Sequence, residues 1–121
     1  MPSVTISQDS NVEMTDFPLL AEQVLEGSPQ AKIWIHAQSA DKLFTQGVWD
    51  CTAGQFSWDY QWDEFVMILE GEATITVDNG EPFTLRAGDF CHFPNGLKTI
   101  WQVDDYVKKT FTLRTPEPLE L

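Results

Sequence analysis

The chain has 121 residues, 42% of them hydrophobic and 12% aromatic, which is enough apolar material for one well-packed domain. The 19 acidic residues outnumber the seven basic ones, and the formal net charge is −12. Because phosphates and anionic lipid surfaces are bound by clustered lysine and arginine, we expect neither a nucleic acid nor a membrane as a partner. The excess of acidic residues is most simply explained by solubility.

The cysteine content and the first residues of the chain indicate in which cellular compartment the protein is expected. Cys51 and Cys91 are too few for a disulfide framework, and we expect both to be reduced. Residues 1–13 are polar and lack the basic start and apolar run of a secretory signal, and no stretch approaches the ~18 apolar residues of a membrane span. We therefore expect a cytoplasmic protein.

The first half of the chain is predicted to hold an arm, a short helix and three strands. Residues 1–16 are mostly polar and are expected to be extended, and the apolar positions of Phe17–Leu25 fall at helical spacing for one or two turns. Alternating or apolar runs then predict strands at Lys32–Ala37, Leu43–Cys51 and Gln55–Tyr60. A glycine-containing turn is expected between the last two strands.

The second half is predicted to consist of short strands separated by turns. These strands are Glu64–Glu70, Glu72–Asp78, Phe83–Arg86, Phe90–Phe93, Ile100–Val103 and Tyr106–Arg114. The first two are expected to form a hairpin that turns at Gly71, and Asp89 is expected to cap backbone N–H groups in the turn after Gly88.

Many short strands with almost no helix favour an all-β fold made of a single antiparallel β-barrel or jelly roll. Residues 1–30 are expected to form an N-terminal arm with at most one short helix packed on the barrel, and residues 31–121 the barrel domain. An immunoglobulin-type sandwich is the alternative, and we rank it second because its characteristic Cys and Trp spacing is missing.

Two spaced motifs connect this fold to a known family. Glu64 is followed after six residues by Gly71, and Gly88 is followed after five residues by Pro94 and then Gly96. In this spacing the chain resembles the two motifs of the cupin superfamily, whose fold is an RmlC-like jelly roll. The wider pattern over residues 45–114 resembles small cupins grouped with the cupin domain of ureidoglycine aminohydrolase. It comprises Gly47, Trp49, Asp63, Ile68–Glu72, Ala87–Asp89, Phe93, Trp101, Val107 and Lys109.

The chain departs from the metal-binding pattern of cupins. The resemblance places Trp58, Tyr60 and Thr99 where such cupins have three histidine ligands, and only the carboxylate of Glu64 remains. Neither histidine of the chain replaces them, since His92 is expected to face outward by alternation and the other lies on a distant strand. One carboxylate does not fill a coordination shell, so we expect no metal and no other cofactor.

The same resemblance implies a pocket inside the barrel. It points Trp58, Tyr60, Glu64 and Thr99 inward, and Trp101 should join them because it lies two residues beyond Thr99. The pocket would have aromatic walls, one carboxylate and two hydroxyls, and it would suit a small polar molecule. Alternatively, the aromatic side chains simply fill the barrel.

Lys109 is the expected partner of the inward carboxylate. It lies between Val107 and Phe111 on the apolar face of the last strand, where an ammonium group must be paired or extend to water at the rim. If Lys109 meets Glu64, the two form a candidate acid–base pair.

Three functions are compatible with these residues. The first is a metal-free cupin that binds a small polar molecule in an aromatic-lined cavity. The second is an enzyme resembling ureidoglycine aminohydrolase or a cupin isomerase, with an unconventional metal site or with Glu64 and Lys109 as acid and base. The third is a structural or regulatory dimer, which an outward cluster of Trp34, Trp49 and Trp62 would favour. A homodimer is expected in any case, through an exposed edge at Lys32–Ala37.

Overall fold

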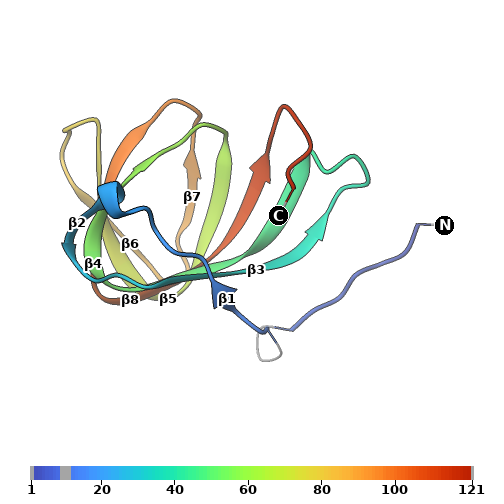
Figure 1. The fold of residues 1–121 in the computed structure, drawn as a ribbon, viewed down its shortest axis with the longest axis horizontal. Coiled ribbons are helices and arrows are strands. Elements are labelled where there is room, and N and C mark those ends of the chain that lie inside the picture. Colours follow the sequence, from blue (N-terminus) through green and yellow to red (C-terminus); the bar gives the residue numbers. More distant parts are fainter. Residues whose placement is uncertain (1, 9–11, 121) are drawn as a thin grey trace.

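A computed structural model describes residues 2–8 and 12–120. The described residues form one eight-stranded sheet in which all strand pairs are antiparallel, with the order β1-β3-β4-β8-β5-β6, β2 paired to β4 and β7 paired to β5 (Figure 1). The elements are β1 (Thr15–Asp16), the 3-10 helix η2 (Ala21–Gln23), β2 (Val24–Gly27), β3 (Ala31–Gln38), β4 (Phe44–Asp59), β5 (Glu64–Val77), β6 (Phe83–Arg86), β7 (Phe90–Phe93) and β8 (Lys98–Arg114). The predicted all-β antiparallel fold is confirmed.

Three long strands, β4, β5 and β8, bend sharply along their length, and the sheet therefore curves around an interior. β4 and β8 pair along nearly their whole length, and β5 pairs with the other side of β8. Register shifts interrupt these ladders between Thr52 and Gly54 in β4 and between Gly71 and Thr74 in β5. Extra residues of this kind sharpen the bend and twist of a strand. Figure 1 shows the result, a sheet that curves round on itself with the connecting loops at its open end.

The bulges also preserve the inward face. Apart from Val48, which is buried on the opposite face, the buried positions of β4 are odd-numbered up to Cys51 and even-numbered at Phe56, and in β5 they change from even at Ile68 to odd at Ala73. Without the extra residue of the bulge, the side chains that now face the interior after the bend would face outward. The bulges therefore allow one strand to line both halves of the interior.

The prediction of six separate strands in these regions is wrong. β4 joins the expected strands Leu43–Cys51 and Gln55–Tyr60, β5 joins those on either side of Gly71, and β8 joins Ile100–Val103 and Tyr106–Arg114. The expected hairpin at Gly71 is absent, because the backbone there is a bend within a strand that stays paired to β8. Glycine and polar residues interrupt the sequence pattern in the same way at a bulge and at a turn.

The N-terminal segment also differs from the prediction. The helical spacing of Phe17–Leu25 yields only the turn η2, after which Val24 enters β2 and pairs with Phe56 of β4. η2 has three residues, and the described part of the chain holds no helix with the length and apolar character to cross a membrane. The short strand β1 covers Lys32 and Ile33 at the outer edge of β3, and the homodimer expected through this edge stays a prediction.

Aromatic side chains dominate the core. The rings of Phe56 and Trp101 are stacked at 6.2 Å, and Trp49 meets Trp101 edge-on at 6.1 Å. Trp49 is only 6% exposed, whereas Trp34 is half-buried on β3 and Trp62 lines an internal cavity. These three tryptophans form no common outward cluster. The feature that would favour a structural or regulatory dimer is therefore not found at these residues.

Candidate functional site in the barrel interior

The interior holds a cavity of about 280 Å³, which we call the inner cavity. Strands β3, β4, β5 and β8 supply most of its wall, the rest comes from Phe17, Tyr60, Trp62 and Leu119, and its surface is almost entirely carbon. Its aromatic lining includes Trp49, Phe56, Trp58, Tyr60, Trp62 and Trp101. At about 30 Å³ for each molecule of liquid water, this space equals roughly nine waters. The aromatic side chains therefore line the barrel without filling it.

A buried ion pair lies in the wall of this cavity. Lys109 Nζ of β8 donates a hydrogen bond of 2.7 Å to Glu64 Oε2 of β5, and both side chains are 8% exposed. The ammonium also lies 4.9 Å from the ring centroids of Trp49 and Trp101. Lys109 does not extend to water at the rim, and the structure brings together the two residues expected to form a pair. Their role in catalysis stays a prediction.

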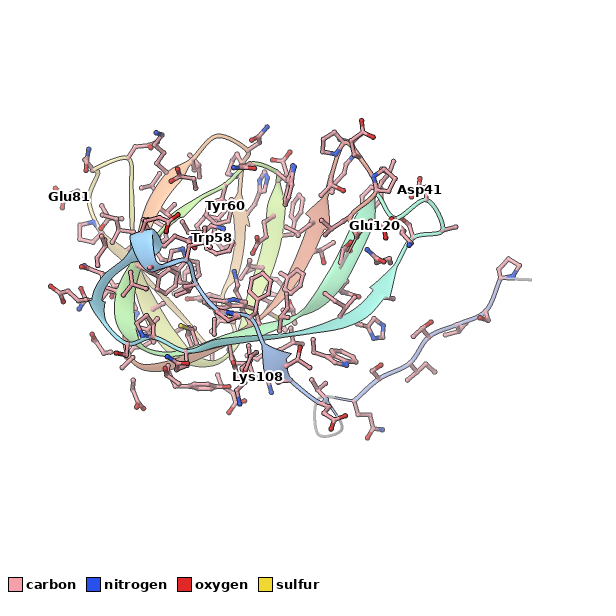
Figure 2. All side chains as sticks on the ribbon, in the orientation of Figure 1. Asp41, Trp58, Tyr60, Glu81, Lys108 and Glu120 are labelled. Carbon is pink, nitrogen blue, oxygen red and sulfur yellow. The ribbon has the colours of Figure 1, made fainter. Side chains whose placement is uncertain are left out.

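Alternation along β8 separates this lysine from its neighbour. Lys108 points away from the enclosed space in Figure 2, and its ammonium lies 3.4 Å from Glu70 at the surface. Lys109 faces the interior together with Val107 and Phe111, as the apolar pattern of the last strand predicts.

Tyr60 and Trp101 place polar atoms in the interior that lack partners. The Tyr60 hydroxyl and Trp101 Nε1 are fully buried, and neither atom makes a hydrogen bond of normal distance and angle with a described residue, although the indole N–H lies near enough to the hydroxyl to affect its pKa. Burial raises the pKa of Tyr60 well above its usual value, the negative charge of Glu64 raises it further, and the nearby Trp101 indole opposes this rise. The hydroxyl is therefore protonated at physiological pH and remains available to donate.

Thr99 does not contribute its hydroxyl to the inner cavity. Thr99 Oγ1 donates a hydrogen bond of 2.7 Å to the backbone carbonyl of Trp58, and the residue is 2% exposed. It is absent from the cavity wall. Of the two hydroxyls expected in the pocket, only that of Tyr60 belongs to a lining residue.

A second space of about 600 Å³, the outer cavity, adjoins the first. The segment around η2 covers one side of it, and residues 57–62 form the other. Figure 2 shows Trp58 and Tyr60 within the curve of the sheet, close to η2 in that view. Both cavities share the lining residues Phe17, Trp58, Tyr60, Trp62, Glu64 and Leu113. Phe17 is not among the predicted pocket residues, although its position as a large apolar residue next to a polar arm is a usable signal.

The histidines lie away from both cavities, as expected. His92 Nε2 lies 3.1 Å from Asp63 Oδ1, and its ring stacks on Phe65 at 4.4 Å on the outer face of β5 and β7. His36 Nδ1 is hydrogen-bonded to Ser7. Among residues 2–8 and 12–120, no group of three or more His, Cys, Asp or Glu side chains is placed to hold a metal ion.

We expect purified protein to contain no stoichiometric transition metal and a chelator to leave its melting temperature unchanged. The reason is the chemistry of the donor set, because Trp58 and Thr99 supply no good ligand and Tyr60 would have to ionise against its raised pKa. Elemental analysis and thermal unfolding with and without EDTA measure this. Stoichiometric metal whose removal lowers the melting temperature would contradict it, since a ligand of the native state must stabilise that state.

The model of the EutQ-like cupin domain matches residues 38–111. A search of curated proteins gives no significant match.

Solved structures share the fold at low sequence identity. A protein of unknown function from Pseudomonas syringae pv. tomato is 22% identical, with a TM-score of 0.78 over 87% of this chain and 46% of its own. The EutQ protein of Clostridium difficile is 18% identical, with a TM-score of 0.65 over 77% of this chain and 66% of its own. A putative ethanolamine utilization protein Q of Salmonella typhimurium is 19% identical, with a TM-score of 0.64 over 91% of this chain and 98% of its own. This chain therefore spans about half the length of the first of these proteins and about two thirds of the second.

Proposed function

Since this chain belongs to the family of EutQ-like cupin domains, we propose that it binds a small molecule inside the barrel without the metal ion of the usual cupin kind. The family match supports a cupin in general, and it does not point to ureidoglycine aminohydrolase in particular. The observation that carries the proposal is the inner cavity, an open space among aromatic rings next to the only described buried ion pair.

The lining revises the expected nature of the ligand. Glu64 and Lys109 are bonded to each other, and the remaining inner surface is almost all carbon. A molecule that is polar throughout would lose its hydration there without gaining hydrogen bonds. The inner cavity therefore favours a ligand with an apolar body, and polar groups of that ligand belong toward the outer cavity.

We expect 2-phenylethanol, a neutral ring compound, to bind to the wild-type protein and to change its tryptophan fluorescence. Leu113 lines both cavities, so the larger side chain of Leu113→Trp should fill part of the space that the ring of the compound would occupy. We expect the affinity to fall at least about tenfold, because the compound would lose most of the apolar burial of its ring. Isothermal titration measures the affinity. The matched control is Leu69→Trp, another half-buried leucine, which lines neither cavity. Equal binding to all three proteins would place the compound outside the barrel and overturn the proposal.

Acid–base catalysis by Glu64 and Lys109 is the second candidate function. It is favoured by the contact of these two groups in a cavity wall, where a proton donor and acceptor would meet a bound molecule. An enzyme of this kind would need the same ligand-binding cavity, so the titration of 2-phenylethanol tests the premise of both candidates.

A further inference from the structure

The outer cavity carries charges of one sign, and we propose that the ligand of this protein is an amphipathic cation. Its apolar body, such as an aromatic ring, occupies the inner cavity, and its protonated nitrogen lies at the junction with the outer cavity. This inference rests on the proposed function, because it assigns a chemical class to the small molecule bound in the barrel.

The lining of the outer cavity is acidic. Glu22, Asp59 and Glu64 lie in its wall, and no lysine, arginine or histidine does. Neither Glu22 nor Asp59 forms an ion pair with any other described residue. Lys98 is the cross-strand neighbour of Asp59 in the ladder of β4 and β8, yet it does not line this space. A cationic group in the outer cavity would therefore meet the unpaired carboxylates of Glu22 and Asp59, while Lys109, the cation of the inner cavity, is already paired with Glu64.

The junction between the two cavities suits a cation for a second reason. Trp58, Tyr60 and Trp62 line both spaces, and ring faces attract cations most strongly where water is excluded. The protein already holds one cation among aromatic rings in this interior, since Lys109 Nζ lies close to two indoles.

Glu64 offers the head group a direct acceptor. Its Oε2 is bonded to Lys109, whereas Oε1 accepts no hydrogen bond from the described residues, and the side chain borders both cavities. Tyr60 lines both cavities, and its buried hydroxyl has no acceptor among the described residues. A protonated amine that also carries a hydroxyl or carbonyl oxygen could bond to both residues.

The overall charge of the protein acts in the same direction. A formal net charge of −12 raises the local concentration of cations and increases their association rate at low ionic strength. Long-range attraction of this kind is not specific to one site, so the experiment must separate it from the local effect of the outer cavity.

Three probes of nearly equal shape test the proposal: phenethylamine, 2-phenylethanol and phenylacetate, titrated calorimetrically into the wild-type protein. We expect the amine to bind about tenfold more tightly than the alcohol, as a cation–π contact and a nearby carboxylate predict, and the acid to bind most weakly. In the double variant Glu22→Gln/Asp59→Asn the amine should lose most of this advantage, whereas the affinity for the alcohol should be unchanged. Both side chains are exposed, so the variant should fold, and circular dichroism checks this.

The matched control is Asp105→Asn/Glu117→Gln, which removes the same charge at two exposed positions outside both cavities. An equal loss of amine affinity in the control would show that only the overall charge acts, and it would overturn the assignment. Equal affinities of amine and alcohol for the wild-type protein would overturn it as well, while leaving a cavity that binds neutral molecules. Absence of binding by all three probes would instead contradict the proposed function itself.

Discussion

Glu64→Gln is expected to lower the free energy of unfolding by about 3 kcal/mol, because it leaves the Lys109 ammonium buried without its counter-charge. The two side chains are 8% exposed and joined at 2.7 Å, so neither charge has water to replace the lost partner. Lys109→Met should cost a similar amount by leaving the carboxylate unpaired. The double variant should lose clearly less than the sum of the two single variants, since it buries no lone charge.

Urea unfolding of the wild type, the two single variants and the double variant measures this coupling. The matched control is the exposed ion pair of Arg86 and Glu72, 3.3 Å apart with side chains 68% and 55% exposed. The cycle of Arg86→Met and Glu72→Gln should give a coupling of only about 0 to 1 kcal/mol, because water screens both charges. Additive effects of Glu64→Gln and Lys109→Met would mean that the buried groups do not interact in solution.

Gly71→Ala is expected to destabilise the protein on the order of 4 kcal/mol, or to prevent folding. Gly71 has a φ of 71°, a conformation that side chains other than glycine rarely adopt, and a Cβ there would overlap the carbonyl oxygen of Tyr106. That oxygen belongs to the backbone of β8, which cannot move away without disturbing its ladders on both sides.

Gly96→Ala is the control for the backbone conformation alone. Gly96 has a φ of 100°, and a Cβ there would meet no atom within 4 Å. Its substitution should cost only about 1 to 2 kcal/mol. Chemical denaturation of both variants separates the contributions. Similar losses would mean that β5 and β8 can move apart at Gly71, and that the close contact is not needed for the bend.

Local pattern was sufficient for much of the fold. The predicted strands Phe83–Arg86 and Phe90–Phe93 coincide with β6 and β7, because each is a short apolar or alternating run between turn residues. The Asp89 carboxylate accepts a hydrogen bond from the Arg86 N–H at 2.8 Å, which confirms the predicted turn cap. These features depend on residues that are neighbours in the chain.

Part of the candidate site could be predicted in the same way. The two-residue period of a strand placed Lys109 among apolar residues, and the cupin spacing placed Glu64 inside the barrel. What could not be predicted is which inward side chains border empty space. Thr99 faces inward yet bonds to the carbonyl of Trp58, and the difference depends on a strand pairing between residues far apart in sequence.

The sequence by itself determined the all-β class and the alternation that separates inner from outer side chains, and the cupin resemblance added that Trp58, Tyr60 and Thr99 stand at the expected histidine positions. Only the tertiary structure decided that β4, β5 and β8 continue through their bends, and that Phe17 and the segment around η2 line the outer cavity. The physical reason is that a bulge and a turn favour the same residues locally. The choice between them is made by hydrogen bonds to a strand that is distant in the chain, and a cavity exists only where such distant elements meet.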